Sequence, residues 1–173
     1  MYPKEYIEFL SHFHGDRDYF ECHEILEDFW KGSDPGNKES IWVGFILLAV
    51  SAYHHRRKNF NGAQRTLEKA ITIISDQSSL LPDLGLDGRI FLQTIKEQLI
   101  GLQNREEYKS MNLPISDPEL LQACMKLCDE KGFDWQRESD LADLEIIHRH
   151  KLRDRSSVIV ERNNAKFKKG SGA

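Results

Sequence analysis

Ile41-Trp42-Val43-Gly44-Phe45-Ile46-Leu47-Leu48-Ala49-Val50 is an uninterrupted apolar run near the start of the chain. With Ser40 at its beginning, the run predicts a helix over residues 40–58. A helix that is apolar on all sides lies at the centre of its domain or at a subunit interface. The run is too short to cross a bilayer. It therefore predicts a central helix, with self-association through that helix as an open alternative.

Helical spacing of apolar residues recurs on both sides of this run, and no stretch shows sustained strand-like alternation. Pro3 suits the first turn of a helix that ends near Gly15, and Asp18 is a cap for a second helix that ends near Gly32. Asn61 is expected to cap a fourth helix, and a fifth spans residues 87–102. The pattern predicts an all-α fold, an antiparallel bundle of about five helices within residues 1–105.

Residues 106–173 are expected to form a helical C-terminal extension of this bundle. Asp117 and Pro118 provide an N-cap and a first-turn proline for a helix that ends by Gly132, and a highly charged helix is expected over residues 137–152. From Lys151 onward the chain carries seven basic residues against two acidic ones, although its net charge is −4. We expect a mobile basic tail, and contact with nucleic acid only through it.

Composition indicates a soluble globular protein. The chain has 173 residues, of which 39% are hydrophobic and 30% charged, enough for one domain with a real core. The N-terminus lacks the basic-then-apolar layout of a secretion signal, and three cysteines do not suggest a disulfide framework. We therefore expect a cytoplasmic protein.

Two polar residues interrupt the apolar side of the second helix. At about 100° per residue, His23 and Glu27 lie one turn apart in a sector shared with Phe20 and Trp30. Glu24 is expected on the opposite side, at most at the rim of this sector. A buried imidazole or carboxylate needs a partner, because leaving it unpaired costs several kcal/mol. The segment therefore contains a polar network or a functional site.

A second polar anomaly lies on the central helix. His54 shares a stripe with Val43, Leu47, Val50 and Arg57 and is expected to face inward. Antiparallel pairing of the second and third helices would bring His54 close to His23 and Glu27, with Asn59 at the nearby corner. The remaining histidines look less informative: His12 and His14 are expected at the surface, and His55 belongs to the basic end of the third helix.

Three interpretations of this cluster remain open. In the first, His23, Glu27 and His54 form a structural network that sets the register of the bundle. In the second, these three residues bind a divalent metal such as Zn, Mn or Fe, with Glu24 at the rim. In the third, the cluster and Trp30 line a pocket for a small molecule, or Glu27 acts as a general base.

Three motifs resemble a known family: Phe20-x-x-His23-Glu24-x-Leu26-Glu27-x-x-Trp30, Tyr53-His54, and Asn59-x-x-Gly62-Ala63 followed by Leu67. They resemble a bacterial and archaeal domain-of-unknown-function family of small helical proteins, most closely its YpuF-like Bacillus branch. The resemblance covers roughly the first 105 residues and implies a compact helical bundle. It implies no activity, substrate or cofactor. The positions that match the family pattern are His23, Glu24, Glu27, Trp30, His54, Asn59 and Gly62.

The expected function is that of a binding module that recognises a protein or small-molecule partner through the polar cluster. The alternative is a metal-dependent, hydrolase-like enzyme that uses His23, Glu27 and His54 as metal ligands and Glu24 as a base. No membrane partner is expected, and the apolar third helix makes a homo-oligomer an open expectation.

Overall fold

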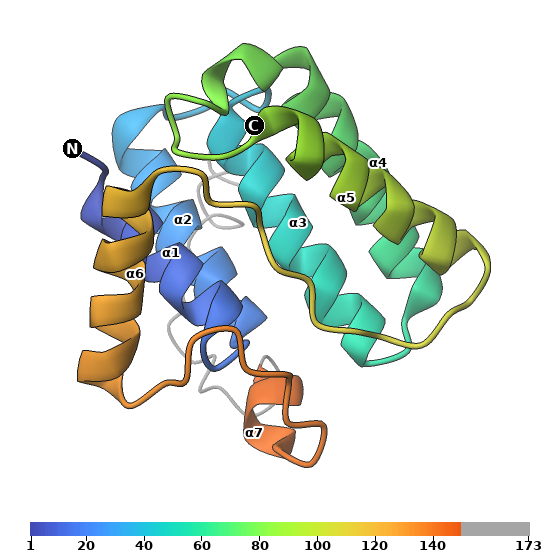
Figure 1. The fold of residues 1–173 in the computed structure, drawn as a ribbon. Coiled ribbons are helices and arrows are strands. Elements are labelled where there is room, and N and C mark those ends of the chain that lie inside the picture. The colour runs from blue at the N-terminus through green and yellow to red at the C-terminus, as the bar shows by residue number, and fades with distance from the viewer. Residues whose placement is uncertain (150–173) are drawn as a thin grey trace, which may run out of the picture.

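The computed structural model describes residues 1–149 of the chain, and the secondary-structure elements of this part are all helices, with no strand (Figure 1). The all-α prediction is therefore confirmed. Two short helices, η1 and α7, accompany six longer ones. The elements are α1 (Lys4–His14), α2 (Tyr19–Ser33), α3 (Ile41–Arg56), α4 (Phe60–Asp76), η1 (Ser78–Leu80), α5 (Gly88–Gln103), α6 (Pro118–Lys131) and α7 (Leu144–Ile147).

Helix α3 lies between α2 and α4, as its apolar sequence indicates. Phe45 of α3 is fully buried, and its ring centroid lies 5.8 Å from those of Phe9 of α1 and Phe91 of α5. Gly44 lets α4 approach closely, since a Cβ there would lie 2.7 Å from Cγ1 of Ile74. No described helix is both long enough and apolar enough to cross a membrane.

Most helix ends follow the cap signals of the sequence. The side chains of Asp18, Ser40, Asp87 and Asp117 each accept a backbone N–H in the first turn of the following helix. The predicted cap of α4 was wrong, because Asn59 caps this helix instead of Asn61. Lys58, just after the end of α3, has a left-handed backbone conformation with φ 63°. The next residue, Asn59, then accepts the N–H of Gly62 in the first turn of α4 through its side-chain oxygen.

In the C-terminal part, the chain becomes helical later than predicted. Among the described residues of the predicted range 137–152, residues 137–143 are not helical, and the first helix is the four-residue α7 (Leu144–Ile147). Asp140 and Asp143 explain the difference: each accepts a backbone N–H two or three residues later, from Ala142 and Ile146, so the chain turns before a helix begins. The basic tail predicted from Lys151 onward lies outside the described residues.

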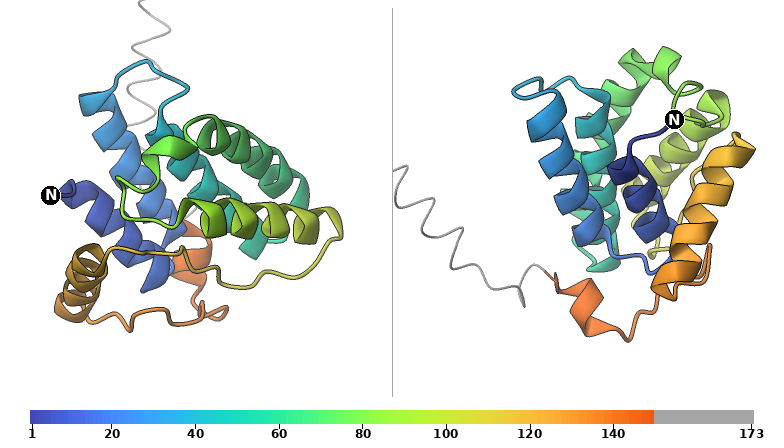
Figure 2. Two further views of the ribbon diagram at one scale, coloured as in Figure 1. Left: turned by 45° about the horizontal axis from the view of Figure 1, so that its top comes forward. Right: turned by 90° about the vertical axis from the view of Figure 1, so that its left-hand side faces the viewer.

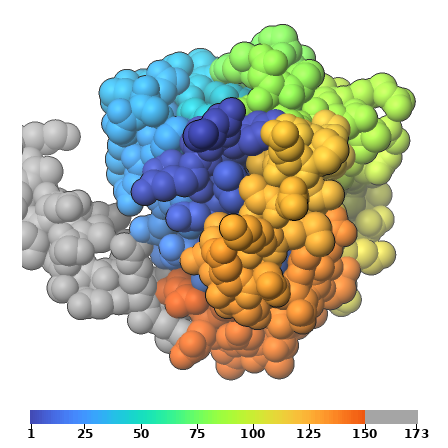
Figure 3. All heavy atoms as spheres, turned by 60° about the vertical axis from the view of Figure 1, so that its left-hand side comes forward, coloured from blue at the N-terminus to red at the C-terminus, as the bar shows by residue number. Residues whose placement is uncertain are grey.

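Helix α6 packs against α1 (Figures 2 and 3). Leu113, Leu120 and Cys124 belong to the same hydrophobic core as helices α1 to α5. The division into a bundle of residues 1–105 and an extension of residues 106–173 stays a prediction.

Two arginines attach the segments around α6 to the bundle, and the sequence pattern missed both. Arg17 is fully buried, and its guanidinium donates to the carbonyl oxygens of Phe13, Met111 and Arg137 and to the side chain of Asn112. Arg56 is also buried; its Nη1 donates to the carbonyl of Arg17 and to the hydroxyl of Ser139.

Candidate pocket and histidine–carboxylate cluster between helices α2 and α3

A pocket of about 230 Å³ lies between α2 and α3. Its walls combine aromatic rings, one aliphatic side chain, two imidazoles and one guanidinium. The lining residues are Tyr19, Phe20, His23, Val50, Tyr53, His54 and Arg57.

The stripe of α3 that contains Val50 and His54 does not face inward, which corrects the sequence prediction. Val43 and Leu47 on the same stripe are also only half-buried, whereas Phe45 on the other side of α3 is completely buried. The reason is that α3 is apolar all round, so its sequence does not distinguish the covered face from the open one. The open stripe forms part of the pocket.

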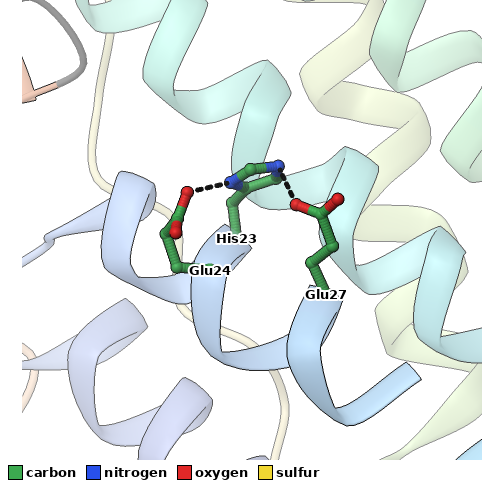
Figure 4. Close-up of side chains that lie close together, drawn as sticks. All are labelled: His23, Glu24 and Glu27. Atoms are coloured by element: carbon green, nitrogen blue, oxygen red, sulfur yellow. Dashed lines mark ion pairs between the residues drawn. The ribbon is translucent and has the colours of Figure 1, made fainter. Parts of the chain in front are cut away.

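His23 lies between two carboxylates of its own helix (Figure 4). Its Nε2 is 3.0 Å from Oε2 of Glu27, and its Nδ1 is 3.4 Å from Oε1 of Glu24 without hydrogen-bond geometry. Lys31 reaches the other oxygen of Glu27, with Nζ 3.0 Å from Oε1. The side chains of His23, Glu24 and Glu27 are 26%, 29% and 32% exposed. The sequence predicted a buried cluster, whereas the structure places it partly in contact with solvent.

The carboxylates approach opposite edges of the imidazole ring, which limits what the cluster can bind as it stands. A metal ion binds one ring nitrogen and lies about 2.0–2.2 Å from each nitrogen or oxygen ligand. Each ring nitrogen of His23 faces its own carboxylate, although one potential ligand atom from each of the three residues lies within 4.8 Å of the others. A metal at Nε2 would have His23 and Glu27 as its nearest ligands, and Glu24 would have to move toward it to supply the third ligand that catalytic zinc sites use.

His54 is held by the cap of the next helix. Asn59 Oδ1 accepts the N–H of Gly62 at 3.1 Å, and Asn59 Nδ2 lies 3.2 Å from His54 Nδ1. Burial lowers the pKa of His54, and the positive charges of Arg57 and Arg65 lower it further. His54 is therefore a neutral imidazole near pH 7.

Arg57 forms the basic edge of the pocket. Its Nε lies 3.3 Å from His148 Nδ1, and its guanidinium lies 5.3 Å from the centroid of the Tyr53 ring. No carboxylate within residues 1–149 forms an ion pair with it.

The structure brings together only part of the predicted cluster. His23 and His54 line the same pocket, and Asn59 contacts it through His54. Within the described chain, one group of potential metal ligands has its binding atoms within 4.8 Å of one another: His23, Glu24 and Glu27. The third member of this group is Glu24, whereas the sequence predicted His54 as the third ligand.

Trp30 lies apart from the pocket walls. Its Nε1 donates to the carbonyl of Asn37 at 3.0 Å, and its ring packs on the edge of the core. Arg57 and Tyr53 were not predicted as site residues. The spacing of Val50, His54 and Arg57 at three and four residues placed Arg57 on the stripe of His54, but it did not mark Arg57 as a site residue.

Two other histidines are buried, and the burial of His14 contradicts the surface position that the sequence suggested for it. His14 is fully buried: its Nδ1 donates to the carbonyl of Leu10 at 2.8 Å, and its Nε2 accepts the N–H of Leu113 at 2.9 Å. Burial is the main cause that lowers the pKa of His14 to about 4. His55 is buried too, and its Nε2 donates to the carbonyl of Glu106.

Fold and site together define a small all-α bundle protein with a ring-lined pocket beside a histidine–carboxylate cluster. Residues 6–66 match a domain of unknown function, DUF309. The chain is 47% identical over 165 residues to Uncharacterized protein YpuF of Bacillus subtilis (strain 168), an alignment that covers 94% of this chain and 93% of that protein. The chain belongs to the DUF309 family. No solved structure matches it.

Proposed function

We propose that this protein is a binding module whose α2–α3 pocket takes a small molecule. The observation that carries the proposal is the lining itself, in which apolar rings surround a few polar groups. Small-molecule sites typically have this composition, because the apolar wall supplies affinity and the polar groups set orientation.

The volume of the pocket indicates the size of its occupant. An apolar cavity of about 150 Å³ is enough for benzene. The pocket, at about 230 Å³, therefore has room for one six-membered ring with a small substituent.

One wall of the pocket is preorganised. Tyr19 is fully buried, its hydroxyl is hydrogen-bonded to that of Tyr108, and the guanidinium of Arg56 lies 4.6 Å from its ring centroid. A wall that is already ordered reduces the entropy lost when a ligand binds.

Filling the pocket tests the proposal. We expect single-ring compounds such as benzyl alcohol and benzoate to shift backbone amide signals of residues 19–23 and 50–57 in ¹H–¹⁵N spectra. Val50→Trp places an indole against the pocket and should weaken this binding at least about tenfold. Val43→Trp is the matched control, since Val43 is a half-buried residue of the same stripe that lines a different groove, between α3 and α4. Binding unchanged in Val50→Trp, or no binding of any ring compound, would contradict the proposal.

A metal-dependent, hydrolase-like activity is the second candidate. The observation in its favour is the 3.0 Å separation of His23 Nε2 and Glu27 Oε2, since two atoms that close can bind one divalent ion. His54 would have to turn away from Asn59 to become a third ligand.

Metal analysis separates the two candidates. If the pocket acts without a metal, protein purified without chelator should contain well below one Zn, Mn or Fe per chain, and EDTA should leave its Tm unchanged within about 1 °C. Stoichiometric metal that is lost in His23→Ala but retained in Asp28→Ala, an exposed acid of the same helix, would favour the metal-dependent enzyme instead.

A further inference from the structure

The orientation of the Asn59 amide follows from the cap of α4. The backbone N–H of Gly62 can only donate, so the Asn59 atom 3.1 Å away must be the oxygen. The NH₂ group of Asn59 then faces His54 Nδ1 at 3.2 Å. This amide can only donate to the imidazole.

The orientation of the amide fixes the tautomer of His54. A ring nitrogen that accepts a hydrogen bond carries no proton, so Nδ1 is unprotonated. The proton of the neutral ring is therefore on Nε2, which is a hydrogen-bond donor. Among residues 1–149 the structure records no acceptor for this N–H, and His54 lines the pocket.

Arg57 adds a second donor group to the same pocket. Its Nε is directed to His148, and no partner within the described chain is recorded for its two NH₂ groups. The planar guanidinium is suited to bind a carboxylate through two parallel hydrogen bonds. These two polar groups of the pocket, His54 Nε2–H and the Arg57 guanidinium, therefore both donate.

The nearby acids do not cancel this preference. Glu24 and Glu27 are absent from the pocket lining, and the His23 ring lies between their carboxylates. Glu27 is also paired with Lys31. Charges that lie outside the pocket and face solvent are screened more strongly than a guanidinium in contact with the ligand.

We propose that the pocket binds a planar aromatic carboxylate, whose ring packs against Phe20 and Tyr53 and whose carboxylate accepts hydrogen bonds from Arg57 and from Nε2–H of His54. The inference rests on the proposed small-molecule function and names the chemical class of its ligand. The carboxylate group is small enough to fit beside one ring in about 230 Å³.

Three probes of almost equal shape test the charge preference on the full-length protein. Benzoate is an anion, benzamide is neutral and benzamidine is a cation. We expect benzoate to bind with a Kd of about 1 mM and benzamide at least about tenfold more weakly, because a charged hydrogen bond is worth more than a neutral one. Benzamidine should bind most weakly.

Two arginine variants locate the effect. Arg57→Gln should weaken benzoate binding about tenfold and change benzamide binding less than about twofold. Arg89→Gln is the matched control: it removes the same charge from an exposed residue of α5 outside the pocket, and benzoate affinity should change less than about twofold. An unchanged benzoate affinity in Arg57→Gln would overturn the inference.

The remaining outcomes separate this inference from the proposed function. Equal affinity for all three probes would overturn the carboxylate assignment and leave the small-molecule function standing, whereas no binding of any ring compound would remove both. Tighter binding of phenyl phosphate than of benzoate would also overturn the carboxylate assignment. ¹⁵N spectra of the wild-type protein give an independent check at pH 7.5: the inference requires His54 with the proton on Nε2, and a proton on Nδ1 alone would contradict it.

Discussion

Replacing Arg17 by methionine is expected to lower the free energy of unfolding by about 3–5 kcal/mol. Arg17 is fully buried and makes four hydrogen bonds, three of them to backbone carbonyls. Methionine fills similar space but cannot donate, and each buried carbonyl left without a donor costs about 1–3 kcal/mol. Urea unfolding followed by circular dichroism measures the change.

The control for this variant is Arg89→Met, which removes an exposed arginine from the first turn of α5 and should change stability by less than about 0.5 kcal/mol. Methionine at position 17 keeps a non-glycine residue at φ 59°, so backbone strain is similar in both proteins. A loss below about 1 kcal/mol in Arg17→Met would show that water or other donors replace the guanidinium.

The location of the Arg17 partners predicts where the damage appears. Met111 and Asn112 precede α6, and Arg137 follows it. Hydrogen exchange in Arg17→Met should therefore increase most in residues 105–117 and 133–143. Uniform acceleration over all helices would show that Arg17 stabilises the bundle globally.

Acid should destabilise the protein through His14. The pKa of its imidazole is lowered from 6.5 to about 4 in the folded protein, chiefly by burial. Below pH 6.5 the unfolded chain gains a proton that the folded protein does not take up, so stability falls as the pH falls toward about 4. A shift of this size corresponds to about 3 kcal/mol.

The hydrogen bonds of His14 explain why it resists protonation. The N–H of Leu113 donates to Nε2 at 2.9 Å, so a proton on Nε2 would face another donor. Nδ1 already donates to the carbonyl of Leu10. The folded protein therefore holds His14 neutral until the pH is close to 4.

His14→Gln isolates this contribution, because glutamine has a donor and an acceptor but does not titrate. The stability difference between wild type and His14→Gln should shrink by about 3 kcal/mol between pH 7 and pH 4, because only the wild type loses stability through this group. The measurement is a series of urea unfolding curves across this pH range. A difference that stays constant with pH would contradict the role assigned to His14.

The local features of the fold were largely predictable. Helix caps such as Asp18, Asp87 and Asp117 depend on one side chain and the turn that follows it, so the sequence contains the necessary information. The contact of His23 with Glu27 is also local, since residues i and i+4 are neighbours on any helix. The family resemblance, now confirmed, includes the motif that contains His23 and Glu27.

The sequence by itself determined the helices, most of their caps and the pairing of His23 with Glu27, because these depend on neighbours within one or two turns. Only the tertiary structure decided which face of α3 is covered, that His14 and Arg17 are buried, and that His54 lines the pocket. These outcomes depend on distant segments such as residues 111–113 and on the packing of α1 and α5 over one side of α3. A helix that is apolar all round has no face that its sequence marks for burial, so the helices that pack against it determine which face is covered.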